Sequence, residues 1–484
     1  MTDPKTGSSR RDFLSLVGLG AVSGAAALTL PYGSAAHAAA APSCAAPTGK
    51  LKSGAGSFNS PIAFKGDSGP LRTRKSMSKL TSAELKKLDA AYKAMRALPA
   101  SDPRSFANQA NIHCWFCGMG EQIHGSYRFF PWHRAYLYFH EKILGALIND
   151  PSFALPYWDW ANDRAIPAGY RSGNLLNSTR DSACNSGSKT LTDQLVGKAA
   201  LSRPLGGIAT AAFVGDETHG GNLEFGPHGG VHIWAGGDMS QLDTAGRDPL
   251  FYGHHNNIDR YWAQWIGSGG GRANPSSSAW LNTSWKFYGP DEKWYVIKVS
   301  DVVNYQTTLK QTWNHDPGPE ESPEQLYHSP GELEAGGGSS ASELNFSDGA
   351  NLDVNPRTYK ASLTATHKKE LANSGTPFTL RVQGIDVPTT DSVIVKLHAQ
   401  DPSSNDGSSA DRPQYVGYLA VVARSAGSMA HGGKLNTALD LVPAVRQTIS
   451  SASDAQLTVV PSSIGGRKPS KITMSHQRIF GHSY

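Results

Sequence analysis

Seven histidines with spacing suited to metal binding occur in this chain, and each lies in an aromatic-rich segment. Imidazole is the commonest protein ligand for transition metals. The histidines form three groups: His113, His124 and His133; His228 and His232; and His254 and His255. Since the chain has 17 histidines in all, spacing and not number must support a metal site.

The two later groups have helical spacing. His228 and His232 are four residues apart, which places both rings on one face of a helix and presents them to a single ion. An isolated pair of this kind is an ordinary surface pair about as often as it is a metal site. His255 and Asp259 share the spacing, so the carboxylate is expected to orient a ring near the ion or to cap the turn.

The first group requires a break between its histidines. His124 and His133 are nine residues apart, which on one helix leaves them about half a turn out of phase. Pro131 suits the first turn of a helix, where its missing N–H is not needed. The sequence therefore predicts His124 in a loop and His133 in the first helical turn. Six imidazoles with no obligatory thiolate favour copper over structural zinc, which prefers closed, Cys-rich sites.

The helices that position these residues follow from apolar spacing. A helix is expected from near Pro131 to about Leu147, with Asn149-Asp150-Pro151 ending it. A second helix is expected to start at Pro227, and a third to cover about Pro249 to Trp265. The domain that holds the histidines, residues 39–314, is therefore expected to be mainly α-helical with long loops.

Beyond this domain the composition changes. Residues 315–356 hold five Pro, six Gly and many Ser and Glu, which predicts a linker. In residues 357–484, short runs around Leu380, Val395, Tyr418 and Val459 alternate between apolar and polar residues. This period of two favours a small antiparallel β-sandwich domain.

Residues 1–38 have the pattern of a twin-arginine signal peptide. Arg10-Arg11 precedes an uncharged apolar run from Leu14 to Leu30, and Ala36-His37-Ala38 supplies a cleavage site. A membrane anchor is the alternative, but the run is short of the ~20 apolar residues that span a bilayer. The expectation is export by the twin-arginine pathway to a secreted or periplasmic, oxidising location, with no membrane anchor after processing.

The composition limits the class of partner. The 484 residues suffice for two or three domains. Lys and Arg total 45 against 40 Asp and Glu, and a net charge of +5 gives no argument for a nucleic-acid partner. Four cysteines are too few for a disulfide scaffold, so each needs its own explanation.

Segments 113–159 and 224–265 resemble the tyrosinase and polyphenol oxidase family of type 3 dicopper proteins, most closely its plant-type catechol oxidase branch. The resemblance implies a helical bundle that binds two copper ions. It implies three ligands for each ion: His113, His124 and His133, and His228, His232 and His255. In the family the last ligand follows the Asp of the Asp-Pro pair by seven residues, which selects His255 and makes His254 its neighbour.

The resemblance also assigns the cysteines. In plant-type enzymes the second Cys of a His-Cys-x-x-Cys motif forms a thioether with the second histidine of the first copper site, which maps to Cys117 and His124. The first Cys, Cys114, is expected to form a disulfide with Cys44. Cys184 is left over, so a disulfide between Cys114 and Cys184 is the alternative.

The activity that the resemblance implies is oxidation of o-diphenols (catechols) to o-quinones, with reduction of O2 to water. Its partners would be small phenolic substrates, O2 and a copper chaperone. The alternatives are a tyrosinase with monophenolase activity, an o-aminophenol oxidase and, more distantly, a haemocyanin-like O2 binder. The resemblance further implies that the β domain covers the active site and keeps the enzyme inactive.

Three further positions bear on the substrate. Glu224 matches the family's glutamate that holds a water near the second copper, but it is equally a carboxylate at a helix N-terminus. Gly229 stands where strong monophenolases often have Asn, so the expectation is mainly diphenolase activity. Leu242 stands where many plant enzymes carry a Phe over the second copper, and the smaller side chain is expected to admit bulkier phenols.

Overall fold

The computed structural model describes residues 44, 56–119, 123–207, 210–314, 343–346, 350–352, 356–373, 378–400, 415–424, 434–462, 472–474 and 476–481. All of them belong to one compact unit, Pro42–Tyr484. The predicted signal peptide, residues 1–38, lies outside the described residues. Within these residues, no helix is both long and apolar enough to cross a membrane.

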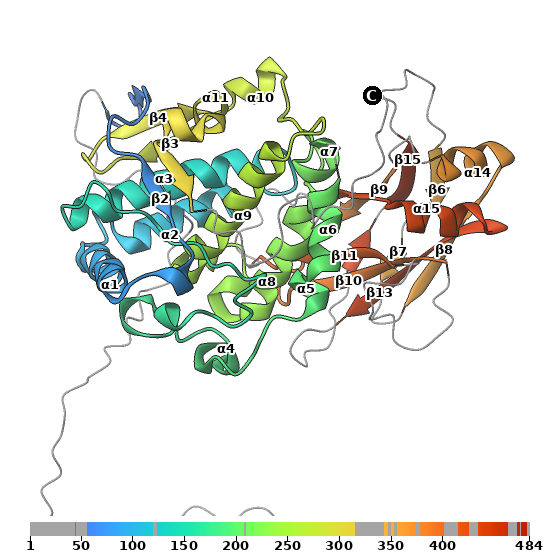
Figure 1. Cartoon of the computed structure of the whole chain (residues 1–484), viewed down its shortest axis with the longest axis horizontal. Helices are drawn as coiled ribbons and strands as arrows, with labels where there is room; N and C mark the ends of the chain where they lie inside the picture. The colour runs from blue at the N-terminus through green and yellow to red at the C-terminus, as the bar shows by residue number, and fades with distance from the viewer. Residues whose placement is uncertain are drawn as a thin grey trace, which may run out of the picture. The chain divides into compact units, whose positions relative to one another are not determined.

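Two long buried helices form the centre of the helical region (Figure 1). They are α3 (Phe129–Leu147) and α9 (Pro249–Gly267), and they pack against each other. Helix α9 begins where the sequence predicts, because the Asp248 side chain accepts a hydrogen bond from the Leu250 N–H and Pro249 occupies the first position. Helix α3 starts two residues before Pro131, which stays within the first turn.

Shorter elements surround these two helices. The α-helices are α1 (Ser82–Ala97), α2 (Phe106–Cys114), α4 (Ser182–Ser186), α5 (Asp193–Val196), α6 (Lys198–Gly206), α7 (Thr210–Phe213), α8 (Gly229–Ala235), α10 (Ser278–Asn282), α11 (Val299–Val303) and α12 (Tyr305–Thr308). The 3-10 and π turns are η1 (Met77–Lys79), η2 (Trp115–Met119), η3 (Ala168–Arg171), η4 (Gly173–Leu175), η5 (Glu224–His228), η6 (Gly237–Ser240) and η7 (Ala245–Arg247). The strands are β1 (Ile62–Ala63), β2 (Arg72–Arg74), β3 (Ser284–Tyr288), β4 (Trp294–Lys298) and β5 (Gln311–Trp313).

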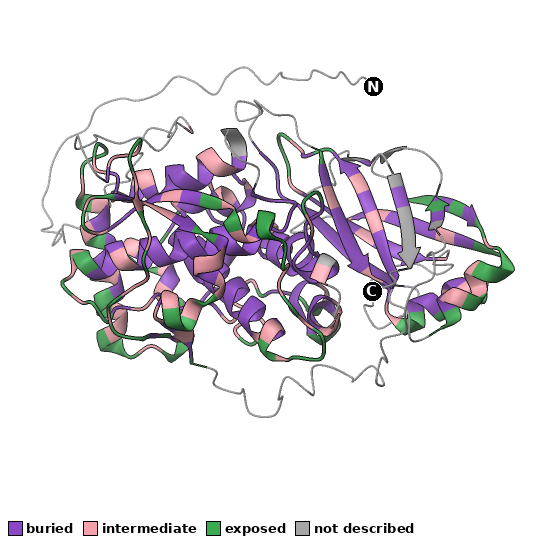
Figure 2. Ribbon diagram, turned by 90° about the horizontal axis from the view of Figure 1, so that it is seen from above, coloured by how far each residue is buried: buried purple, intermediate pink, exposed green. Residues whose placement is uncertain are grey.

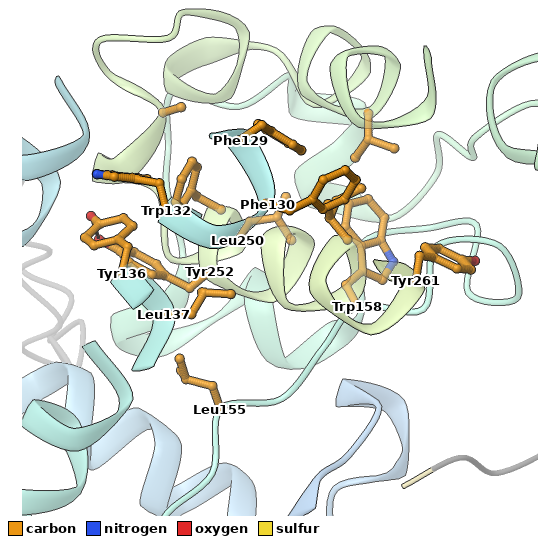
Figure 3. Close-up of a cluster of buried hydrophobic side chains, with 14 of the residues drawn as sticks. Phe129, Phe130, Trp132, Tyr136, Leu137, Leu155, Trp158, Leu250, Tyr252 and Tyr261 are labelled. Atoms are coloured by element: carbon orange, nitrogen blue, oxygen red, sulfur yellow. Dashed lines mark hydrogen bonds between the residues drawn. The ribbon is translucent and has the colours of Figure 1, made fainter. Parts of the chain in front are cut away.

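Aromatic side chains fill the core of the helical region. Figure 3 shows Trp132, Tyr136 and Tyr252 close together beside α3, and the ring centroids of Trp132 and Tyr136 are 5.0 Å apart. Figure 2 shows buried residues through the middle of this region and exposed residues on its outer helices and loops. Because interiors pack as tightly as organic crystals, such rings hold α3 and α9 in a fixed relation.

The C-terminal region forms two four-stranded sheets around a second core, which confirms the expected mainly α fold with a small β-sandwich. One sheet has the order β11-β10-β13-β8 and the other β12-β9-β15-β6, where β6 is Glu343–Phe346, and all their described pairings are antiparallel. The elements are β8 (Arg357–Ser362), α14 (Ala365–Ala372), β9 (Phe378–Ile385), β10 (Val393–Ala399), β11 (Tyr415–Val421), β12 (Leu435–Asp440), α15 (Pro443–Ser450), β13 (Asp454–Ser462), β14 (Ile472–Met474) and β15 (His476–Gly481).

The predicted linker, residues 315–356, is too long. Strands β6 (Glu343–Phe346) and β7 (Ala350–Leu352) lie inside it and pair with β15 and β14. Leu344 and Phe346 are each 3% exposed and contribute to the sandwich core. Two apolar residues among many Ser and Gly are too few to show a period, so partner strands define these strands and local sequence does not.

Candidate metal centre

The helical core gathers all seven histidines of the three groups, and each is at most 3% exposed. His113 comes from the end of α2, His133 from α3, and His254 and His255 from α9. His124 lies in the loop before α3, as predicted, because the helix starts only at Phe129. The rings of His133 and His255 stack with centroids 4.1 Å apart and an interplanar angle of 9°.

His228 and His232 share one face, as their spacing predicts, with ring centroids 4.7 Å apart. His228 ends the π turn η5, where Gly226 has non-helical φ/ψ, and His232 lies on α8. The Nε2 atoms of His228 and His232 are each 3.3 Å from His255 Nε2. Three imidazole nitrogens from three places in the fold therefore converge on one point.

Backbone carbonyls fix the orientation of three rings. His133 Nδ1 donates to the Phe129 carbonyl at 2.8 Å, His228 Nδ1 to the Glu224 carbonyl at 2.9 Å, and His232 Nδ1 to the Met239 carbonyl at 2.7 Å. A proton held at Nδ1 leaves the Nε2 lone pair available to a metal ion. This is the usual way in which a protein selects the tautomer of a ligand histidine.

The electrostatics keep these imidazoles neutral. Burial lowers the pKa of His133 to about 3 and that of His232 to about 4, and it lowers the pKa of His113, His124 and His255 well below the usual range. Among the described residues, both nitrogens of His124 and Nε2 of His133 are buried with no hydrogen-bond partner. Buried nitrogens without partners are costly unless a ligand satisfies them, so the donor set fits transition-metal ions that imidazole binds, such as copper.

His254 lies beside the second group. Its ring stacks on His228 with centroids 5.3 Å apart and lies edge-on to His232 at 4.8 Å. Nitrogens of His228, His232, His254 and His255 lie within 4.8 Å of one another. Geometry alone therefore does not separate His254 from His255, and the assignment of His255 as the ligand stays a prediction.

Two phenylalanines that histidine spacing did not reveal complete the centre. Phe129 on α3 packs against His228 of the second group with ring centroids 4.7 Å apart, and Phe251 on α9 packs against His113 of the first at 4.6 Å. Each phenylalanine precedes a histidine of its own helix by four residues, at 133 and 255. That shared spacing is the signal that identifies them. Each helix thus supplies an apolar wall for the opposite group.

Glu224 connects the loop of His124 to η5. Its Oε1 accepts from the Gly125 N–H at 2.8 Å, and its Oε2 is buried without a partner among the described residues. Burial raises the pKa of Glu224 well above its usual range, against the opposing effects of the Gly125 N–H and the Arg424 charge. Beyond its place at the start of η5, the Glu224 carboxyl group holds two ligand-bearing segments together through its contact with Gly125.

Asp259 does not orient the ring of His255, which corrects the expectation from their spacing. Its Oδ1 accepts from Arg134 Nε at 2.6 Å and its Oδ2 from Arg74 Nη1 at 3.3 Å. Hydrogen bonds between charged partners are stronger than those to a neutral imidazole. The two arginines therefore take the carboxylate, and Arg74 is too distant in sequence for spacing to have revealed it.

The β domain reaches the centre through the residues that follow β11. The Leu242 N–H donates to the Ala423 carbonyl at 2.9 Å, and Ser392 Oγ donates to the Ser240 carbonyl at 2.6 Å. Arg424, which directly follows Ala423, is 5% exposed, and its charge acts on Cys117 and Glu224. No pattern in the sequence pointed to this contact.

Cys44 and Cys114 form a disulfide, and Cys184 is a buried free thiol, so the alternative pairing of Cys114 with Cys184 is not formed. Cys117 is also buried, and its Sγ lies 3.2 Å from His113 Nε2. Sγ of Cys117 and ring nitrogens of His113 and His124 all lie within 4.8 Å of one another. The thiol is thus close to the ring with which a thioether is predicted.

We expect a covalent thioether between Cys117 and His124 in copper-loaded protein. Forming the bond would release the thiol hydrogen and one ring-carbon hydrogen as protons, and bound copper together with O2 would accept the two electrons. Peptide mass spectrometry after reduction should show the two peptides joined and two hydrogens lighter than their sum. Cys184, which is also buried, is the control and should be alkylated fully once the protein is unfolded. Full alkylation of Cys117 as well would contradict the thioether.

Comparison with known proteins places this centre in a family context. Residues 103–211 and 185–268 match the sequence profile described as the common central domain of tyrosinase. A chloroplastic polyphenol oxidase of Malus domestica is 36% identical over 262 residues, which are 44% of this chain and 44% of that protein. The chain spans about half the length of the curated relatives it matches.

Solved structures extend the likeness to the β domain. Latent apple tyrosinase aligns with a TM-score of 0.68 and 26% identity over 87% of this chain and 100% of that chain. The polyphenol oxidase of Grenache (Vitis vinifera) aligns with a TM-score of 0.51 and 32% identity over 56% of this chain and 92% of that chain.

The predicted twin-arginine export and the secreted or periplasmic location are contradicted by these relatives. The curated proteins that match are chloroplastic plant polyphenol oxidases. The Arg10-Arg11 pair, the apolar run and the small residues at 36–38 were therefore not sufficient to identify the pathway.

Proposed function

We propose, since the chain belongs to the tyrosinase and polyphenol oxidase family, that it oxidises o-diphenols to o-quinones and reduces O2 to water. The observation that carries the proposal is the convergence of buried, neutral imidazoles whose Nδ1 atoms are held by backbone carbonyls. The donor set fits the family's two copper ions. When bound, these ions supply the electron exchange between a catechol and O2.

We assign three ligands to each ion: His113, His124 and His133 to the first, and His228, His232 and His255 to the second. The protein contributes a buried site around them. Phe129 and Phe251 pack against ligand rings of both groups, and the backbone carbonyls prevent three of the rings from turning away.

Diphenols are favoured over monophenols as substrates. A monophenol must lose its proton before it binds copper well, and the buried Oε2 of Glu224 is the group that would hold a water for this step. Gly229 has no side chain that could hold this water. A Cβ at that position would lie 2.6 Å from the Ala420 carbonyl oxygen of β11. An amide side chain therefore does not fit there while the β domain is in place.

The proposal is tested with copper-loaded full-length protein and with protein from which copper has been removed. Catechol, tyrosine and o-aminophenol are supplied separately under air, while O2 uptake and quinone absorbance are recorded. We expect turnover of catechol, slower turnover or none of tyrosine, and no activity without copper. Reversible O2 binding without catechol turnover would indicate an oxygen carrier, and faster turnover of o-aminophenol would indicate an aminophenol oxidase.

We further propose that residues 39–314 are the catalytic domain and that the sandwich covers its entrance. The sandwich contacts the neighbours of two assigned ligands. A Cβ at Gly125, beside His124, would lie 2.8 Å from Leu435 of β12, and Gly229, beside His228, faces Ala420 of β11. These contacts support a role of the β domain in limiting access to the copper ions.

Ionisation of Asp440 at this boundary is expected to destabilise the protein. Asp440 ends β12 and its carboxylate faces Gly207, which follows α6. Burial raises the pKa of Asp440 to about 7 from 3.8, and Arg446 opposes the shift. From about pH 4 to pH 7 the unfolded chain loses this proton while the native protein keeps it, so the free energy of unfolding falls as pH rises through this window.

Asp440→Asn should remove this contribution to the pH dependence. Denaturant unfolding of metal-free protein at several pH values between about 4 and 8 measures the slope. Asp386→Asn, which changes an exposed aspartate of the same sandwich, is the matched control and should keep the wild-type slope. An Asp440→Asn slope equal to that of wild type would show that Asp440 is not the group responsible.

A further inference from the structure

A buried cluster of charged side chains lies between β2, α3 and α9, and none of its members is an assigned copper ligand. We name it the charge cluster, and its members are Arg72, Arg74, Arg134, Glu141 and Asp259. Each is at most 3% exposed. Buried ion pairs add little stability compared with apolar packing, but they hold a defined geometry and are costly to break. The position of this cluster on the two ligand-bearing helices therefore needs an explanation other than stability.

Arg74 contacts both helices with one guanidinium. Its Nε donates to Glu141 Oε2 of α3 at 2.8 Å. Its Nη1 donates to two acceptors on α9, Asn256 Oδ1 at 3.1 Å and Asp259 Oδ2 at 3.3 Å. Because the guanidinium is planar and rigid, these contacts fix the distance and direction between the two helices.

Arg72 contacts the same glutamate without joining the helices. Its Nε donates to Glu141 Oε1 at 2.7 Å. Its other acceptors in the described part of the chain are Asp67, Pro70 and Leu309, none of which is on α9. Arg72 and Arg74 are 1% and 0% exposed and lie two residues apart on β2. Arg72 and Arg74 are thus similarly buried and both contact Glu141, and of the two it is Arg74 that connects α3 to α9.

The contact points of Arg74 are close to copper ligands. Asn256 directly follows His255, and Arg134, which directly follows His133, donates to the other oxygen of Asp259 at 2.6 Å. The rings of His133 and His255, assigned to different ions, stack at 4.1 Å. A helix rises about 1.5 Å per residue, so a slip of one residue between α3 and α9 would separate these rings.

We propose that Arg74 is a positioning residue that fixes α3 against α9 and thereby sets the spacing of the two copper sites. The inference rests on the proposed dicopper function. Arg74→Lys keeps the positive charge that balances Glu141 and Asp259, but the ammonium group lacks the fork that reaches both helices. Arg72→Lys is the matched control, because it makes the same chemical change at the same glutamate.

Two measurements on full-length protein test the proposal. Copper affinity is measured by competition with a chelator, and the spin coupling of the oxidised sites by electron paramagnetic resonance. Two bridged Cu(II) ions at the right spacing are coupled and give no signal, whereas Cu(II) ions that are too far apart give one. We expect Arg74→Lys to lower copper affinity about tenfold and to produce a Cu(II) signal. Arg72→Lys should keep the wild-type affinity and remain without a signal.

The outcomes separate this inference from the proposed function. Wild-type protein that does not bind two coupled copper ions would refute the proposed function itself. If wild type is coupled and the two lysine variants have equal affinity and equal spectra, the positioning role of Arg74 is refuted. Should Arg74→Lys fail to fold, Asp259→Asn takes its place, because it weakens the charged contacts of Asp259 with both Arg74 and Arg134. Wild-type affinity and no Cu(II) signal in Asp259→Asn would also refute the proposal.

Discussion

Replacing His255 with Ala is expected to abolish catechol oxidation and to lower bound copper from two ions to about one per chain. His255 Nε2 is the point on which the Nε2 atoms of His228 and His232 converge, at 3.3 Å from each. Removing it leaves two ligands for the second ion, which is too few for tight binding. His133→Ala should have the same effect on the first ion. Copper is measured by elemental analysis after dialysis, and activity by O2 uptake.

His254→Ala is the matched control for this prediction. His254 is as buried as His255 and adjacent to it on α9, so both variants create a cavity of similar size in the same core. We expect His254→Ala to keep two coppers per chain. If it loses one copper while His255→Ala keeps both, the ligand assignment at the second site is reversed.

Much of the centre was predictable because its signals are local. Pro131 and the pair Asp248-Pro249 mark where α3 and α9 begin, and a spacing of four places His228 and His232 on one face. Neither signal needs information from distant parts of the chain. The same spacing gave the wrong partner for Asp259, because spacing states which residues share a face and says nothing of charged groups that arrive from another strand.

Most of the features that sequence did not reveal depend on long-range contacts. Arg74 reaches Asp259 across 185 positions, and β6 is a strand only because β15 lies beside it. The approach of Ala423 to Leu242 likewise joins two segments with no shared pattern. Local propensity and periodicity carry no information on such pairs, so they had to be seen in the fold.

Removing the β domain is expected to raise catechol turnover several-fold with little change in bound copper. Phe225, next to Glu224, packs in the core of the sandwich, and the Gly220 N–H donates to the Asn436 carbonyl at 2.9 Å. These contacts do not pass through the segment after residue 314, so cutting that segment leaves the domain in place. We therefore expect the rise only when cleavage is followed by mild detergent and by separation of the two parts.

Arg424→Gln provides a version of this experiment in which the domain stays. Arg424 is buried near Cys117 and Glu224, and it directly follows the residue that pairs with Leu242. Loss of its charge and length should raise catechol turnover of the full-length chain, although less than removal of the domain does. Arg357→Gln, on the exposed start of β8, is the control and should leave turnover unchanged.

Equal turnover before and after complete removal of the domain would contradict its covering role, and the contact of Phe225 with the sandwich core would then serve stability alone.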